Sequence, residues 1–237
     1  MAVVAAFHSE SWEARVWHIS ESVDELKSMT SHRWDNDPMF LSFSNDHRQC
    51  EWLSVRCLLI DMLGHDDNIV YCDGKPSLLS SSRHISIAHT TDHAILVVSD
   101  ISHPVTADIE SKTERAYRIH KAFLDDMELS FLHSASDFSV AEYSCCIWCA
   151  KEAIYKLMDS GCYSFKNDCH CTSPMRVPLT RSSVPYIYGR FSAFETCSSS
   201  SQRFLVHYFL LWGKITLAFA EQLQQPSEHI KIDFLHL

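Results

Sequence analysis

Trp148-Cys149-Ala150-Lys151-Glu152-Ala153-Ile154-Tyr155-Lys156 lies inside the most helix-like segment of the chain, and the rest of the sequence is best understood from it. Upstream, Ser139 and Glu142 have the spacing of a capping box, and Gly161 offers a left-handed stop downstream. This spacing predicts a helix of about five turns. Apolar residues recur at helical steps and form one stripe for a core: Ile147, Ala150, Ile154, Leu157 and Met158.

A second face of the same predicted helix carries charge. Trp148, Glu152 and Lys156 follow one another at four-residue steps, which places a carboxylate directly beneath an ammonium. The simplest interpretation is an ion pair on a solvated face, worth roughly 0.2–0.5 kcal/mol. A functional interpretation needs a second acidic group elsewhere in the chain.

A second acidic pair occurs in residues 105–110. Val105, Ala107 and Ile109 alternate with Thr106, Asp108 and Glu110, so a short strand would point both carboxylates to one side. Two like charges on one side of a strand repel each other, unless they face water or share a cation. Oxygen ligands of this kind suit Mg²⁺, which usually keeps water and substrate phosphate in its shell. A solvated edge strand would give the same pattern, so both interpretations stay open here.

Four motifs together resemble a known family. Gly74-Lys75-Pro76, the predicted strand 84–90, Asp108-Ile109-Glu110 and Trp148-x-x-Lys151-Glu152-Ala153-x-x-Lys156 occur in the order and approximate spacing of the 4'-phosphopantetheinyl transferases. The similarity is to the long, single-chain Sfp type. The resemblance implies an α+β fold of two similar α/β subdomains, which are related by a pseudo-twofold axis and bind coenzyme A at their junction. His103-Pro104 breaks the chain, so we expect subdomains at residues 1–104 and 105–237, although no internal repeat is legible.

The resemblance also implies a reaction. A holo-acyl-carrier-protein synthase type of enzyme transfers 4'-phosphopantetheine from coenzyme A to a serine of an apo carrier protein and releases adenosine 3',5'-bisphosphate. By analogy, Asp108, Glu110 and Glu152 would hold Mg²⁺. Glu152 would take the serine proton, directly or through a metal-bound water, and Lys156 would stabilise or protonate the departing phosphate.

Basic residues that match the family are candidates for holding the coenzyme's phosphates. Lys75 follows a predicted turn, His89 lies near the end of a predicted strand, and Arg56 lies on a predicted helix over residues 46–62. Lys151 is a weaker candidate for the same role, and Arg48 is expected to face solvent.

Three residues depart from the family pattern. Thr106 stands where the family usually has glycine, and Ala88 and Thr90 stand where serines commonly flank the histidine. Ala88 removes a hydroxyl, and Thr106 is expected to restrict the backbone beside the metal.

Composition limits the partners of the chain. Its 20 basic and 30 acidic residues give a net charge of −10, which argues against nucleic acid and an anionic membrane as partners. Coenzyme A and carrier proteins are themselves anionic, so their binding would rely on local basic groups, a metal and apolar contacts. We expect a monomer.

The 10 cysteines are expected to be reduced thiols in the cytoplasm, because residues 2–7 are too short for a signal peptide. Cys146, Cys149, Cys169 and Cys171 could instead form a zinc clip, although the first two fall inside the predicted helix, where small buried thiols explain them better. Two alternatives to the enzyme therefore remain: a homologue that binds coenzyme A or carrier protein without turnover, and a thiol-rich structural module with zinc.

Other segments give further expectations. Hydrophobic periodicity predicts one helix over residues 113–127 and a hairpin of residues 204–212 with 215–220. The tail from residue 222 is polar at first and is expected to be loosely held.

Overall fold

The protein is an α+β protein with antiparallel sheets, and its chain forms two compact units. The computed structural model describes residues 2–65, 67–111, 113–134, 139–158, 164–171, 186–196, 202–212, 214–222 and 230–234. The first unit comprises Met1–Ile101 with Ser227–Leu237, and the second comprises Ser102–Pro226.

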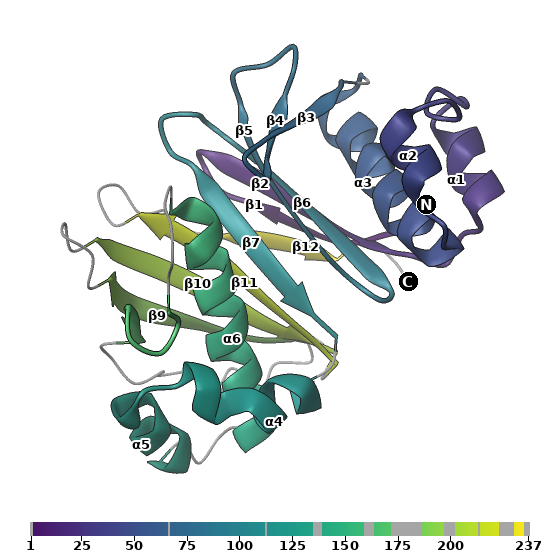
Figure 1. Ribbon diagram of the computed structural model, residues 1–237. Coiled ribbons are helices and arrows are strands. Elements are labelled where there is room, and N and C mark those ends of the chain that lie inside the picture. Colours follow the sequence, from purple (N-terminus) through teal and green to yellow (C-terminus); the bar gives the residue numbers. More distant parts are fainter. Residues whose placement is uncertain are drawn as a thin grey trace. The chain divides into compact units, whose positions relative to one another are not determined.

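The first unit is a seven-stranded sheet with three helices (Figure 1). The strand order is β12-β1-β2-β6-β5-β4-β3, and every pairing is antiparallel. The strands are β1 (Val3–His8), β2 (Trp12–His18), β3 (Ile69–Cys72), β4 (Lys75–Leu78), β5 (His84–Thr90), β6 (His93–Ser99) and β12 (Lys231–Phe234). The helices are α1 (Val23–Met29), α2 (Pro38–Ser42) and α3 (Asp46–Leu63).

Helix α3 confirms the helix predicted over residues 46–62. The side chain of Asn45 accepts a hydrogen bond from the amide of His47 at 2.7 Å and caps the first turn. Gly64 ends the helix with a φ of 71°, a left-handed conformation that glycine adopts without steric cost. The helix packs against β2, β6 and α1, so it covers the apolar face of the first sheet.

The C-terminal tail differs from its prediction. Strand β12 pairs with β1 at the edge of the first sheet, with Phe7 opposite Ile232. The tail was expected to be loose and to belong with the second half of the chain. It instead covers the backbone groups of β1, which would otherwise form an unpaired sheet edge.

Where the structure describes it, the second unit is a five-stranded antiparallel sheet with three helices (Figure 1). The strand order is β7-β11-β10-β9-β8. The strands are β7 (Val105–Glu110), β8 (Cys169–Cys171), β9 (Tyr186–Thr196), β10 (Arg203–Leu211) and β11 (Ile215–Gln222). The helices are α4 (Thr113–Phe123), α5 (Asp126–Ser134) and α6 (Val140–Leu157). Strands β10 and β11 confirm the predicted hairpin, with His207 opposite Phe219.

Helix α6 has the predicted capping box. The Ser139 hydroxyl accepts from the amide of Glu142 at 3.2 Å, and the Glu142 carboxylate accepts from the amide of Ser139 at 2.8 Å. The helix packs against β7, β10 and β11 (Figure 1). Its apolar stripe lies in the core of the second unit. It ends at Leu157, because the backbone of Met158 is extended. Gly161, the predicted stop, lies outside the described residues.

The helix predicted over residues 113–127 is two helices. Helix α4 ends at Phe123, and α5 begins at Asp126 after a short break. At this break, Asp125 accepts from the amide of Glu128 at 2.7 Å, and Glu128 accepts from the amide of Asp125 at 2.9 Å. This reciprocal cap starts a new helix, and helical periodicity alone does not distinguish two helices in succession from one continuous helix. No helix in the described part of the chain is long and apolar enough to cross a membrane.

Candidate active site

The acidic strand predicted from the sequence is β7, and helix α6 covers its polar face. Val105, Ala107 and Ile109 are buried, whereas Asp108 and Glu110 are half-buried on the other side of the strand. This alternation follows from the two-residue period of a strand, and it confirms that both carboxylates share one side.

Lys156 links the last turn of α6 to this acidic side. Its ammonium donates to the Asp108 carboxylate at 2.9 Å and to the backbone carbonyl of Ala107 at 2.8 Å. The lysine therefore forms its ion pair with the strand. The sequence alone suggested a different pair, with Glu152 along the helix. A cation lies beside the two acidic residues of β7 as a result.

Glu152 is the residue of this site whose pKa is most perturbed. Burial and the nearby charge of Asp108 raise its pKa to about 7, Lys156 opposes the shift, and Glu110 adds to it. The pKa of Glu110 is also raised, by burial and by Asp108, against the opposing effects of Arg115, a hydrogen bond from Trp148 and Lys156. The carboxylates of Asp108, Glu110 and Glu152 therefore repel one another, although they come from a strand and a helix far apart in sequence.

This donor set fits a hard divalent cation. Carboxylate oxygens are the ligands that Mg²⁺ prefers, and a divalent charge would relieve the repulsion that raises the pKa values of Glu110 and Glu152. Within the described ranges, no three His, Cys, Asp or Glu side chains stand close enough to form a ready-made ligand group. Side-chain rotation at half-buried Asp108, Glu110 and Glu152 would be needed to gather them around one ion.

Arg56, a predicted phosphate ligand in the first unit, is buried in the structure. Its side chain is only 3% exposed. The guanidinium lies over the ring of Trp52 at 3.3 Å from the centroid and donates to the Trp52 carbonyl at 3.2 Å. Arg56 is therefore buried among aromatic rings, where cation–π contacts hold it, and this placement argues against contact with a phosphate in solvent.

Arg48 is exposed, as predicted, and it belongs to a cluster of polar side chains on α3 and β5. Arg48 donates to Nε2 of His89 at 3.1 Å and pairs with Glu51. Nδ1 of His89 lies 3.4 Å from the Glu51 carboxylate, and Nδ1 of His47 lies 3.2 Å from it. Glu51 is buried, and it gathers three basic side chains at the surface of the first unit. We call His47, Arg48, Glu51 and His89 the α3–β5 cluster.

The sequence contained only part of the signal for this cluster. Arg48 and Glu51 are three residues apart on one helix, a spacing that brings side chains together. His89 joins them only because β5 lies in the same sheet that α3 covers, and a sequence does not show this tertiary arrangement.

Lys75, the other predicted phosphate ligand, is exposed at the start of β4, after a turn in which Gly74 has a φ of 80°.

The sequence profile of the 4'-phosphopantetheinyl transferase superfamily matches residues 104–227, which is just over half of the chain. The chain belongs to this superfamily. No match is found among curated proteins. The matched residues include Asp108, Glu110, Glu152 and Lys156, so the acidic site lies within the part that defines the family.

Membership in the 4'-phosphopantetheinyl transferase superfamily makes this chain a transferase, with phosphopantetheine as the class of group transferred. The family match does not extend to Lys75, His89 or the rest of the α3–β5 cluster. The interpretation of those residues therefore depends on their own geometry.

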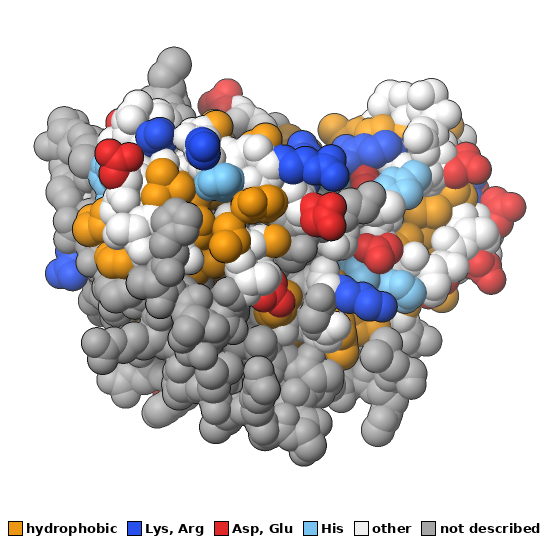
Figure 2. All heavy atoms as spheres, turned by 90° about the horizontal axis from the view of Figure 1, so that it is seen from below, with side chains coloured by type: hydrophobic (Ala, Val, Ile, Leu, Met, Phe, Trp, Pro, Cys, Tyr) orange, Lys and Arg blue, Asp and Glu red, His pale blue; other side chains and the backbone are white. Residues whose placement is uncertain are grey.

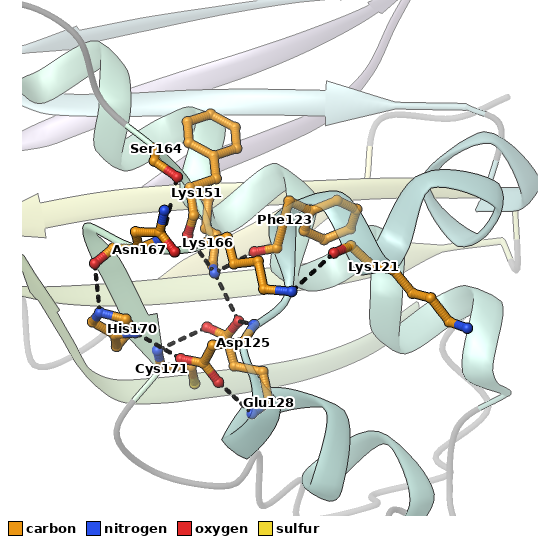
Figure 3. A network of polar contacts seen from close by, with 11 residues as sticks. Lys121, Phe123, Asp125, Glu128, Lys151, Ser164, Lys166, Asn167, His170 and Cys171 are labelled. Carbon is orange, nitrogen blue, oxygen red and sulfur yellow. Dashed lines mark hydrogen bonds and ion pairs between the residues drawn. The ribbon is translucent and has the colours of Figure 1, made fainter.

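Lys151 of this transferase lies in a buried polar network (Figure 3). This position does not fit its predicted role as a phosphate ligand. Its ammonium is fully buried and donates to Glu128 at 2.7 Å and to the carbonyls of Phe123 and Phe165 at 2.8 Å each. An ammonium has three donors, so these acceptors use all of them. Lys151 therefore has no donor left for a coenzyme phosphate. It joins α6 to the α4–α5 break and to the segment before β8.

Breaking this buried ion pair should destabilise the protein strongly. We expect Lys151→Met to lower the free energy of unfolding by about 3–5 kcal/mol, because Glu128 would be left as a buried, uncompensated charge. Lys151→Met combined with Glu128→Gln should recover much of this loss, since the amide oxygen can still accept from the Cys171 amide. Urea unfolding measures both effects. Lys166→Met, at a half-buried lysine whose hydrogen bond to the Lys121 carbonyl is exposed (Figure 3), should change stability by less than about 0.5 kcal/mol. A loss of similar size in both single variants would contradict the assignment.

The cysteines of the two units are free thiols where the structure describes them. Cys146, Cys149, Cys169 and Cys171 are all fully buried in the core of the second unit. Burial raises the pKa of Cys146 and Cys149 well above the ordinary range, so both stay protonated. A zinc clip needs thiolates, and the described residues therefore give it no support.

Proposed function

We propose that the protein transfers 4'-phosphopantetheine from coenzyme A to a serine of an apo carrier protein, in the manner of a holo-acyl-carrier-protein synthase. The observation that supports this most is the electrostatic coupling of Asp108 and Glu110 on β7 with Glu152 and Lys156 on α6, where Lys156 also bonds Asp108. The proposal also includes the long, single-chain type and a pseudo-twofold relation between the units. A monomeric state, a cytoplasmic location and the absence of nucleic-acid and membrane partners complete it.

The proposed reaction is a displacement at phosphorus. The serine oxygen forms a bond to the phosphorus on the pantetheine side of the pyrophosphate, and the bond from that phosphorus to the bridging oxygen breaks. Adenosine 3',5'-bisphosphate leaves with the electron pair of that bond. The protein contributes mainly positioning and charge neutralisation to such a step.

Residues of the second unit have distinct roles in this proposal. Asp108, Glu110 and Glu152 would hold Mg²⁺, which supplies charge neutralisation at the pyrophosphate oxygens. Glu152 would accept the serine proton as the general base. Lys156 places its ammonium beside the same carboxylates, where it can stabilise charge on the departing phosphate.

Residues of the first unit would bind phosphate groups of coenzyme A. The α3–β5 cluster groups Arg48, His47 and His89 around one carboxylate, so it brings basic side chains together in a chain whose net charge is −10. Basic, acidic and histidine side chains are interspersed on the face shown in Figure 2, which favours recognition by such local groups over a broad positive surface. Arg48 replaces Arg56 in our assignment, and Lys75 and His89 keep their predicted roles.

Arg48 should affect coenzyme binding more than turnover. We expect Arg48→Ala to raise the KM for coenzyme A by about tenfold with little change in kcat, because a phosphate contact of this kind is made in the ground state and the transition state alike. Steady-state kinetics over a range of coenzyme A concentrations measures this. Arg118→Ala, at an exposed arginine paired along α4, is the matched control and should behave as the wild type. An unchanged KM in Arg48→Ala would remove Arg48 from the site.

The proposed function is tested by mass measurement. The protein is incubated with coenzyme A, Mg²⁺ and a panel of apo carrier proteins from fatty-acid, polyketide and peptide synthesis. The expected result is one carrier that gains a single phosphopantetheine arm on its serine. Coenzyme A binding without a modified serine on any carrier would select the non-catalytic binding homologue and overturn the enzyme.

A further inference from the structure

Thr106 connects the strand and the helix that carry the acidic site. This residue stands at a position where the resembling family usually has glycine, and its side chain is buried in the second unit. Its hydroxyl donates to the backbone carbonyl of Ala153 in α6 at 2.6 Å. The two residues are 47 positions apart in sequence, so the bond is a tertiary contact between β7 and α6.

This hydrogen bond lies next to residues of the acidic site. Ala153 directly follows Glu152, and Thr106 lies two residues before Asp108 on the same side of β7. The Lys156 ammonium makes a second link, to the carbonyl of Ala107. Two adjacent residues of the strand are therefore bonded to the last turn of the helix, immediately beside the three carboxylates.

The last turn of a helix needs such links to hold its position. Helix ends fray, because their final carbonyl groups lack partners within the helix. Helix α6 ends only four residues beyond Ala153, at Leu157. A displacement of about 1 Å between catalytic groups can reduce a rate by about a hundredfold. A bond from β7 to this turn therefore restricts the displacement of Glu152 and Lys156 relative to the strand, and the proposed reaction would be sensitive to such a displacement.

We propose that Thr106 is a positioning residue, whose hydroxyl fixes the last turn of α6 on β7 and so holds Glu152 and Lys156 in place relative to Asp108. The inference builds on the proposed transfer reaction. Glycine has no side chain and cannot make this bond. Threonine has less backbone freedom than glycine at this position, but its hydroxyl bonds directly to the helix.

Three substitutions separate the hydroxyl from the shape of the side chain. Thr106→Val keeps the branched shape and removes the donor, whereas Thr106→Ser keeps the donor and removes a methyl group. Ser144→Ala is the matched control, because the buried Ser144 hydroxyl also donates to a carbonyl of α6, that of Val140 at 2.8 Å, but without reaching another element.

The first measurement is hydrogen exchange in the full chain without metal or coenzyme A. We expect the amides at the end of α6, residues 153–158, to exchange several-fold faster in Thr106→Val than in the wild type, Thr106→Ser and Ser144→Ala. Unchanged exchange in Thr106→Val would overturn the proposal, because the bond would then not restrain the helix end.

The second measurement is transfer to the carrier protein identified by the mass assay. Thr106→Val should lower kcat by about tenfold to a hundredfold with an unchanged KM for coenzyme A, and Thr106→Ser should restore most of the rate. Equal rates in Thr106→Val and the wild type, or equal losses in Thr106→Val and Thr106→Ser, would overturn the positioning role. A wild-type protein that modifies no carrier would instead overturn the proposed function, so the two failures are distinguishable.

Discussion

Glu152→Gln is expected to abolish transfer, with a loss in kcat of at least about 10²–10⁴-fold. The amide has nearly the shape of the carboxylate, but it cannot accept the serine proton and is a poor ligand for Mg²⁺. The raised pKa of Glu152 and the nearby charges of Asp108 and Glu110 mark it as the group most adapted to proton transfer in the site. The measurement is the carrier-modification assay at saturating coenzyme A and Mg²⁺.

Glu142→Gln provides the matched control for this substitution. Glu142 lies on the same helix and caps its first turn, and glutamine can keep that cap. Its transfer rate should stay within about twofold of the wild type, since positions away from the site contribute little to the barrier. Near-normal turnover by Glu152→Gln would remove the proposed mechanism.

Stability measurements show whether the inactive variant remains folded. In the folded protein the pKa of Glu152 is about 7, against an ordinary value of 4.5, so ionisation of this group is penalised only in the folded state. Its contribution to stability is therefore fully present below pH 4.5 and is lost as the pH rises through 7. Glutamine never ionises. Without metal, Glu152→Gln should thus have a higher Tm than the wild type at pH 8, with a smaller difference at pH 5. A lower Tm at pH 8 would contradict this account.

Asp108→Ala is expected to lower kcat by at least about 10²-fold. The substitution removes a proposed Mg²⁺ ligand and also the partner of the half-buried Lys156 ammonium. Asp108→Asn separates these effects, because an amide oxygen can still accept from Lys156 but carries no charge. Both variants should lose transfer if the charge is what matters. Recovery of activity in Asp108→Asn alone would mean that orientation of Lys156 is the essential role.

Glu114→Ala is the control for Asp108→Ala. Its carboxylate is exposed on α4 and pairs with Arg118 only along the helix surface. We expect normal transfer and a change in stability below about 0.5 kcal/mol, as is usual for exposed ion pairs. Loss of transfer in this variant would indicate that the effect of Asp108→Ala is not specific to the acidic site.

Local patterns predicted those parts of the fold that depend on neighbouring residues. The capping box of Ser139 and Glu142, the glycine stop at Gly64 and the alternation in β7 each involve residues close in sequence, and the structure contains all three. The break between α4 and α5 was not predicted, because it depends on a cap at Asp125 that competes with continued helix formation. Strand β12 was missed, since it is stabilised by pairing with a strand at the opposite end of the chain.

The charged residues illustrate the same division. The sequence determined which residue types are available: acidic groups at two-residue spacing in β7, and a glutamate and a lysine at four-residue spacing in α6. It could not determine their partners. Lys151, Lys156 and Arg56 are all cations on helices, yet one is buried against Glu128, one joins Asp108, and one lies on the ring of Trp52. Burial and long-range contacts decide between these outcomes, and both arise only when distant segments pack together.

The sequence by itself thus determined helices α3 and α6, the alternation of β7 and the family to which this protein belongs, because these depend on the order and spacing of nearby residues. Only the tertiary structure decided that Thr106 reaches Ala153, that Arg48 meets His89, and that the pKa of Glu152 is raised to about 7. Each of these depends on distances between groups far apart in the chain, and electrostatic and hydrogen-bond energies change steeply with such distances.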